Sequence, residues 1–224
     1  MKCGSLPAKA DASKQREFYD TVLRPLMERA RSGEVALLFL DASHFVMGCD
    51  FLGYIYSKSR RMIRTWSGRK RYNVLGAIDF VTKQVFTVTN AEYITAVQVN
   101  AMLRKLSESY AGKEIHIVLD NARYQKCKIV QDLAGELGIR LEYIPPYSPN
   151  LNLIERAWKF VKGELRTKYY DDFTVFCERI DAILAGTCSL YKEQMDRLVG
   201  EKVQMFDNLS AITENAYAAL PSAA

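Results

Sequence analysis

Histidine is scarce in this chain, and its scarcity limits the chemistry that the chain can perform. The 224 residues include only two histidines, His44 and His116, which excludes a histidine-rich metal site. The five cysteines are widely spaced and include no CxxC pair, which argues against a disulfide framework and against a thiolate zinc site. We therefore expect reduced cysteines, as is usual for a cytoplasmic protein.

Long hydrophobic segments are also missing. No apolar run approaches the roughly 20 residues that a membrane-spanning helix needs. Residues 1–15 lack the apolar centre of a signal peptide. The sequence thus predicts a soluble cytoplasmic protein with no membrane partner. The hydrophobic content of 49% is enough for a core of one or two domains, and the net charge of +5 permits a polyanionic partner without requiring one.

The order of apolar segments predicts a mixed α/β sheet with helices on its faces. Residues 35–40 form an apolar run without alternation, which is typical of a central strand buried on both faces. Residues 72–90 predict a hairpin, and residues 115–120 and 139–144 predict two further strands. Helices are expected at 12–32 (kinked or broken at Pro25), 95–111, 126–136 and 151–166, with two or three more after residue 169.

Three carboxylates stand at the ends of these predicted elements. The strands at 35–40 and 115–119 run into Asp41 and Asp120, and the helix after the proline-rich turn 145–150 carries Glu155 near its start. Carboxylate oxygens suit Mg²⁺, and two such ions about 3.5–4 Å apart can activate one oxygen and stabilise another. We expect Asp41 to bridge two ions, with Asp120 and Glu155 each completing one side.

Structural alternatives exist for these acids. An aspartate at a strand end often only begins a loop. Asn152 and Glu155 fit a capping box, in which the glutamate bonds back to the amide of the capping residue. Glu155 can also form an ion pair with Lys159 one turn later. The residues expected to shape the site are Asn121, Tyr147, Ser148 and Asn152, whereas His44 fits a local structural role better than that of a base.

Basic residues form two candidate DNA-binding groups. The first lies in an irregular insert and comprises Lys58, Arg60, Arg61, Arg64, Trp66, Arg69, Lys70 and Arg71. The second comprises Lys159, Lys162 and Arg166, which share a helical face with Glu155. Phosphate neutralisation combined with aromatic stacking is typical of nucleic-acid binding, and a solvated charged surface is the alternative.

One long motif resembles a known family. Asp120-Asn121-Ala122, a helix, and then IPPYSPNLNLIERAWK at residues 144–159 resemble the DDE transposases of the mariner-like superfamily, most closely their bacterial insertion-sequence branch. The 34 residues between Asp120 and Glu155 match the spacing of this group, and FLDASHF at residues 39–45 resembles its first-strand motif. The resemblance covers residues 35–168.

The resemblance implies a ribonuclease H-like fold with a mixed five-stranded sheet, and Mg²⁺ or Mn²⁺ held by Asp41, Asp120 and Glu155. It implies cleavage at transposon ends and cut-and-paste strand transfer into target DNA, in a homodimeric complex at the bacterial nucleoid. The predicted domains are a helical lead-in or linker (1–34), the DDE catalytic domain (35–168) and a C-terminal helical extension (169–224).

The sequence departs from the family pattern at several points. Relatives often carry a histidine shortly after Asp-Asn-Ala, where Arg123, Tyr124 and Gln125 stand here, and a proline where this chain has Leu153. Only about 34 residues precede the first strand, too few for the helix-turn-helix region of relatives, so a separate or frameshift-fused segment is expected to supply it. A catalytically silent DNA-binding remnant that regulates a full-length transposase, and a nuclease without strand transfer, are the alternative functions.

Overall fold

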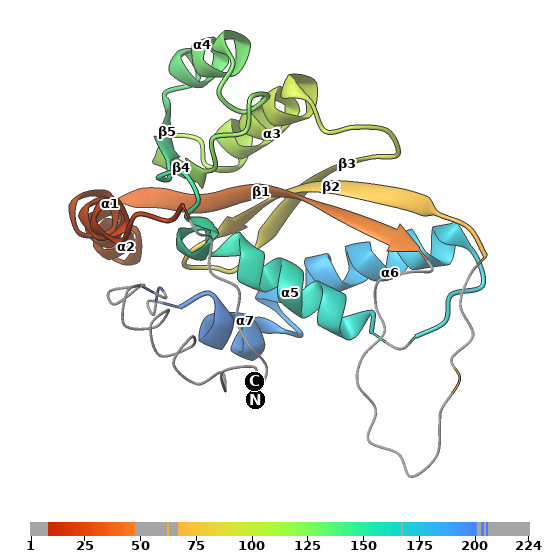
Figure 1. Ribbon diagram of the computed structural model, residues 1–224. Helices are drawn as coiled ribbons and strands as arrows, with labels where there is room; N and C mark the ends of the chain where they lie inside the picture. Colours follow the sequence, from red (N-terminus) through yellow and green to blue (C-terminus); the bar gives the residue numbers. More distant parts are fainter. Residues whose placement is uncertain are drawn as a thin grey trace, which may run out of the picture.

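Five strands form one mixed sheet in the order β3-β2-β1-β4-β5 (Figure 1). The computed structural model describes residues 9–47, 62, 67–166, 168–200, 203 and 205. Strand β1 is antiparallel to β2, and β2 to β3, whereas β1 is parallel to β4, and β4 to β5. The strands are β1 (Val35–Met47), β2 (Lys70–Asp79), β3 (Val85–Asn90), β4 (Glu114–Leu119) and β5 (Ile139–Tyr143). The predicted mixed five-stranded sheet is confirmed.

Helices cover both faces of the sheet (Figure 1). Helices α3 (Ala96–Ser109) and α4 (Lys128–Glu136) pack on one face. The other face holds α5 (Ile154–Glu164), α6 (Phe173–Ala185) and α7 (Lys192–Leu198), and the N-terminal helices α1 (Ala12–Phe18) and α2 (Arg24–Arg31) join the same cluster. A π-helical turn at Tyr19–Leu23 separates α1 from α2, and Pro25 lies in the first turn of α2, which confirms the predicted break.

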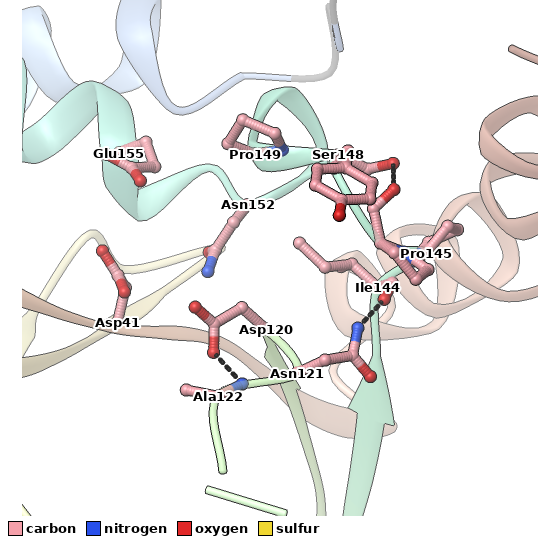
Figure 2. A pocket seen from close by; sticks show the side chains of 12 residues that line it. Asp41, Asp120, Asn121, Ala122, Ile144, Pro145, Ser148, Pro149, Asn152 and Glu155 are labelled. Carbon is pink, nitrogen blue, oxygen red and sulfur yellow. Dashed lines mark hydrogen bonds between the residues drawn. The ribbon is translucent and has the colours of Figure 1, made fainter. Parts of the chain in front are cut away.

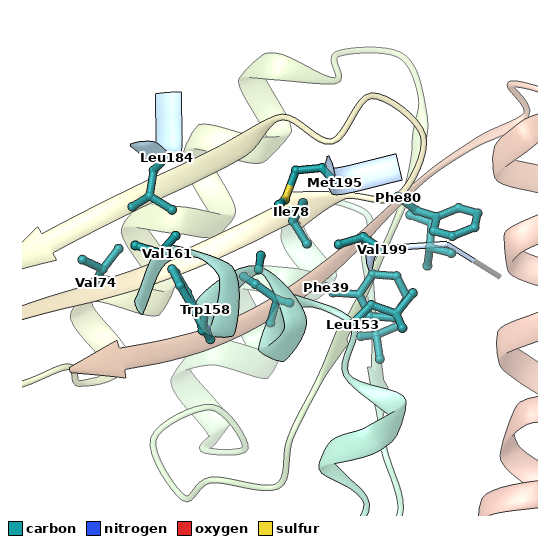
Figure 3. Packing of buried hydrophobic residues seen from close by; sticks show 14 of the residues in the cluster. Phe39, Val74, Ile78, Phe80, Leu153, Trp158, Val161, Leu184, Met195 and Val199 are labelled. Atoms are coloured by element: carbon teal, nitrogen blue, oxygen red, sulfur yellow. The ribbon is translucent and has the colours of Figure 1, made fainter. Parts of the chain in front are cut away.

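Strand β1 is buried on both faces, as its unbroken apolar run predicts. Because side chains alternate along a strand, Leu38 and Leu40 contact the α3–α4 side while Leu37 and Phe39 contact the α5 side. All four side chains are buried. Figure 3 shows the α5-side core, in which Phe39, Val74 and Trp158 lie between the sheet and the helices.

The prediction that the first strand ends at Asp41 is wrong. Strand β1 continues through Asp41 to Met47, because antiparallel β2 supplies hydrogen-bonding partners along this whole length, with Asp41 opposite Gly76. The parallel ladder with β4 is shorter and ends at the Phe39–Val118 pair. Asp41 therefore lies just beyond the point where β4 stops, in the middle of a strand.

The terminal helices share the core of the sheet. Leu26 and Met27 from α2 and Met195 from α7 lie in the same hydrophobic cluster as Phe39. Lys83, which is 6% exposed, also links the β2–β3 turn to the end of α7, because its ammonium donates to the carbonyl of Val199 at 2.8 Å. The boundaries proposed at residues 34 and 168 remain a prediction. Within the described ranges, no helix is long and apolar enough to cross a bilayer.

Candidate active site

Strand alternation places Asp41 and Asp120 on the face covered by α5. Asp41 stands two residues after Phe39 on β1, and Asp120 stands two residues after Val118 at the end of β4; both hydrophobic residues belong to the α5-side core. Because β1 and β4 are parallel neighbours with Phe39 opposite Val118, the two carboxylates come together where β4 ends. The sequence-based pairing of these acids is therefore present in the structure.

Helix α5 brings Glu155 to the same place. Its buried side chains Ile154, Ala157, Trp158 and Val161 form an apolar stripe, which lies against the sheet. Glu155, in the first turn, projects from a different face and is exposed. Figure 2 shows Glu155 from α5, Asp41 from β1 and Asp120 from the end of β4 around one opening.

The three acids line a pocket of about 320 Å³. All four residues that were predicted to shape the site, Asn121, Tyr147, Ser148 and Asn152, line it as well. Asn121 donates to the carbonyl of Ile144 and so joins the loop after β4 to the end of β5. Tyr147 has a φ of +60°, a left-handed backbone conformation that is uncommon outside glycine. The proline-rich turn is thus a fixed wall of the pocket.

The capping-box alternative for Glu155 is wrong. The Asn152 amide N–H donates to the carbonyl of Pro149 at 3.0 Å, so it is not engaged by Glu155. The Asn152 side chain instead donates to the carbonyl of Leu40 at 2.9 Å, which ties the start of α5 to β1 beside Asp41. Leu153, the residue before α5, is fully buried and anchors the helix start where relatives carry proline. Glu155 is left directed at the pocket.

The alternative ion pair between Glu155 and Lys159 is also absent between these two described residues. The positive charge that acts to lower the pKa of Glu155 is that of Lys162, two turns along α5. His44, on the opposite face of β1 from Asp41, bonds to the Asn73 side chain at 2.6 Å, a contact that fits the predicted local structural role.

The carboxylates affect one another. Burial, the charge of Glu155 and the charge of Asp120 raise the pKa of Asp41 to about 7, while the Ala42 amide and the Trp158 indole oppose the rise. Loss of surrounding water raises the pKa of Glu155, an effect opposed by Lys162 and reinforced by Asp120. Three acids that repel one another in a partly buried pocket create a site at which a cation would be stabilised.

The donor set of the pocket fits divalent cations. Its ligating groups are oxygens, the ligands that Mg²⁺ and Mn²⁺ prefer. The buried Asn152 Oδ1, which has no hydrogen-bond partner, adds a further oxygen at the pocket wall. Among the described side chains, no group of three or more His, Cys, Asp or Glu residues is placed to hold a metal ion as the side chains stand, so the three acids surround the pocket without forming a compact cluster.

The predicted DNA-binding residues fall into two sets. Lys58, Arg60, Arg61, Arg64 and Trp66 lie outside the described residues. Arg69, Lys70 and Arg71 are exposed at the start of β2, and Lys159 and Arg166 are exposed along α5. The ammonium of Lys162 lies over the ring of Phe45, 5.8 Å from the ring centre. Phe45 stands four residues after Asp41 on β1. The cations on α5 therefore extend from the pocket along the distal half of β1.

Sequence reasoning missed Gly76, which sets the position of α5 through its contact with Trp158. Gly76, opposite Asp41, leaves room for the Trp158 ring: a Cβ atom there would come within 2.5 Å of that ring. Trp158 also packs edge-on against Phe45, with ring centres 6.0 Å apart. An isolated glycine inside an apolar strand was the available signal, because it often marks a close approach.

Comparison with known structures identifies the architecture. The chain superposes on the Mos1 transposase paired-end complex with left transposon end, with a TM-score of 0.61, 14% identity, and coverage of 91% of this chain and 68% of that one. It superposes on the catalytic domain of Mos1 mariner transposase with a TM-score of 0.58, 14% identity, and coverage of 87% and 93%. The fold is therefore ribonuclease H-like.

The amino-acid sequence assigns the chain to a family. Residues 36–177 match the family described as DDE superfamily endonuclease, and this match covers more than half of the chain. The chain belongs to the DDE superfamily of endonucleases. No curated protein matches it significantly.

Proposed function

We propose that this chain is the catalytic domain of a transposase that cuts DNA at transposon ends and joins the freed ends to target DNA. The observation that carries the proposal is the meeting of Asp41, Asp120 and Glu155, from three separate elements, at one open pocket. Family membership and the likeness to transposase structures support it. We further assign the chain to the bacterial insertion-sequence branch of the mariner-like group, acting in the cytoplasm at the nucleoid.

The pocket residues have two roles: the acids would bind the metal ions, and Asn152 positions the helix that carries one of these acids. Asp41, Asp120 and Glu155 would together hold Mg²⁺ or Mn²⁺ ions through their carboxylate oxygens. When bound, such ions activate the attacking oxygen and stabilise the leaving oxygen of a phosphodiester. Asn152 holds the α5 start against β1, so that Glu155 keeps its place relative to Asp41. Solved Mos1 complexes with Mn and with Mg support this choice of metals.

DNA would bind along the basic side chains that extend away from the pocket. Lys159, Lys162 and Arg166 form one stripe beginning at Glu155, and Arg69, Lys70 and Arg71 stand at the start of β2. Lysine and arginine along a strand or helix neutralise backbone phosphates without reading sequence. End recognition is assigned to a helix-turn-helix segment, separate or frameshift-fused, and the active complex is taken to be a homodimer on two DNA ends.

The test is metal-dependent cleavage of DNA that carries the element's ends. Wild type is compared with Asp120→Asn and Glu155→Gln, each expected to lose on the order of 10³-fold in rate. The matched controls are Asp171→Asn and Glu136→Gln, which change exposed acids remote from the pocket lining and keep wild-type rates. The assay is run with and without an upstream helix-turn-helix segment.

Each result decides between functions. Cleavage and joining that both require Asp120 and Glu155 support the transposase. Cleavage without joining points to a nuclease of the same fold. DNA binding without any cleavage, in either Mg²⁺ or Mn²⁺ and with the upstream segment present, would refute the proposed enzymatic function. The chain would then be a regulatory DNA-binding remnant.

A further inference from the structure

Gln125 is a fully buried polar residue beside the catalytic pocket. It lies in the connection between β4 and α4, where its exposed fraction is 0%. Its backbone is held on both sides: its N–H donates to the carbonyl of Ala122 at 2.9 Å, and its carbonyl accepts from the Tyr143 hydroxyl at 3.1 Å. Because a buried amide must find hydrogen-bond partners among its neighbours, the groups around Gln125 show what its side chain binds.

The amide of Gln125 faces Asp120. Only with its nitrogen toward the aspartate are both ends of the amide satisfied: the nitrogen then donates to Asp120 Oδ1 at 2.5 Å and to the Asp120 carbonyl at 3.1 Å. The opposite end of the amide lies 3.4 Å from the Tyr124 hydroxyl, which can donate to the amide oxygen. The reverse orientation would bring the amide oxygen against a carboxylate oxygen.

The two oxygens of Asp120 are therefore unequal. Oδ1 accepts from Gln125 and also from the Ala122 N–H at 2.9 Å. Oδ2 accepts no hydrogen bond from any described residue. Figure 2 shows the bonded oxygen of Asp120 turned toward Ala122 and the other turned toward the opening beside Asp41 and Asn152.

Asp79 provides an internal comparison, because it also ends a strand. Its Oδ1 accepts from the N–H groups of Val81 and Thr82, both at 2.7 Å, and its Oδ2 accepts from the Tyr110 hydroxyl at 2.6 Å. Both oxygens of Asp79 are thus used within the fold, as is expected of a structural aspartate. Asp120 has the same turn contact but keeps one oxygen available at the pocket.

We propose that Gln125 is a positioning residue for Asp120, fixing Oδ1 so that Oδ2 is held toward the pocket as a single-oxygen metal ligand. The proposal rests on the proposed function, because it concerns the same metal site. Groups that hydrogen-bond to a metal ligand orient it, and losing such a partner typically weakens metal affinity by about 10–100-fold. Gln125 makes no contact with DNA in this scheme and acts only through Asp120.

The experiment measures Mn²⁺ binding to the 224-residue chain by calorimetry, without DNA. Gln125→Met keeps the length of the side chain and removes its donor, and Gln125→Asn keeps the amide but shortens its reach. Gln131→Met is the matched control, because Gln131 is exposed and its amide donates to the Lys126 carbonyl, away from Asp120. Thermal unfolding without metal shows which variants remain folded.

The folded Gln125 variants are expected to bind Mn²⁺ about 10–100-fold more weakly than wild type and Gln131→Met, with a matching rise in the Mn²⁺ concentration that half-saturates DNA cleavage. Wild-type Mn²⁺ affinity in either folded Gln125 variant overturns the proposal. If wild type itself neither binds Mn²⁺ nor cleaves DNA, the proposed function has failed, and the two failures are thereby told apart.

Discussion

Replacing Gly76 by alanine tests how tightly the position of Glu155 depends on packing. The new Cβ would stand 2.5 Å and 2.8 Å from two atoms of the Trp158 ring and 3.3 Å from a methyl group of Ile154. Trp158 is 2% exposed and cannot swing into solvent without leaving the core. Either the ring or the whole of α5 must therefore move away from β2 by about 1 Å to restore ordinary contact.

The expected cost follows from this clash. Overpacking a dense core typically costs about 1–3 kcal/mol, which lowers the melting temperature of a chain of this size by about 2–12 °C. A displacement of about 1 Å at the start of α5 also carries Glu155 away from Asp41, and misplacement on that scale reduces a catalytic rate by about 10²-fold. Thermal unfolding and metal-dependent DNA cleavage measure the two effects separately.

A second glycine on α5 supplies the control. Gly163 has open space around its Cβ position, so Gly163→Ala should raise stability by about 0.5–1 kcal/mol through helix propensity and leave cleavage unchanged. In a Trp158→Phe background, which lacks the clashing ring atoms, Gly76→Ala should cost at least about 1 kcal/mol less than in wild type. Gly76→Ala with wild-type melting temperature and cleavage rate would refute the reasoning.

Three further predictions concern other parts of the structure. Tyr147→Gly relieves the φ of +60° at an exposed residue, so urea unfolding should show no loss of stability, while a drop in DNA cleavage would show that the ring serves the pocket. Asn152→Ala leaves the Leu40 carbonyl buried without its donor and should cost about 1–3 kcal/mol in urea unfolding; an unchanged midpoint contradicts this. Burial lowers the pKa of Lys83 to about 8, so the folded chain loses this proton before the unfolded chain does, and stability should rise between about pH 8 and 10.5. Lys83→Met should flatten that rise in denaturant midpoints measured across the same pH range.

Much of the fold could be predicted from local patterns. The apolar run before Asp41 predicted a strand buried on both faces, and the helix expected at 95–111 is α3, which begins with a capping box of Thr95 and Gln98. These predictions succeed because side-chain alternation and helix capping depend on residues close together in the sequence. The strand end at Asp41 could not be predicted, because β1 continues only through its pairing with β2.

The candidate site was predicted in part. The three acids and the four site-shaping residues all line one pocket. The capping box of Asn152 was a reasonable local alternative, but the side chain bonds to Leu40, 112 residues away in the sequence. Gln125 was noted only as one of three residues standing where relatives often carry a histidine, because its contact with Asp120 depends on complete burial in the folded chain. Most of the basic insert lies outside the described residues, so its role in DNA binding stays a prediction.

The sequence by itself determined which acids are available, the segments that carry them and the family to which the chain belongs. Only the tertiary structure decided how those acids meet. Parallel pairing of β1 with β4 brings Asp41 and Asp120 to one face, and the close approach of Trp158 to Gly76 fixes the helix that holds Glu155. The physical reason is that hydrogen-bond partners and packing distances between remote segments exist only once the chain has folded.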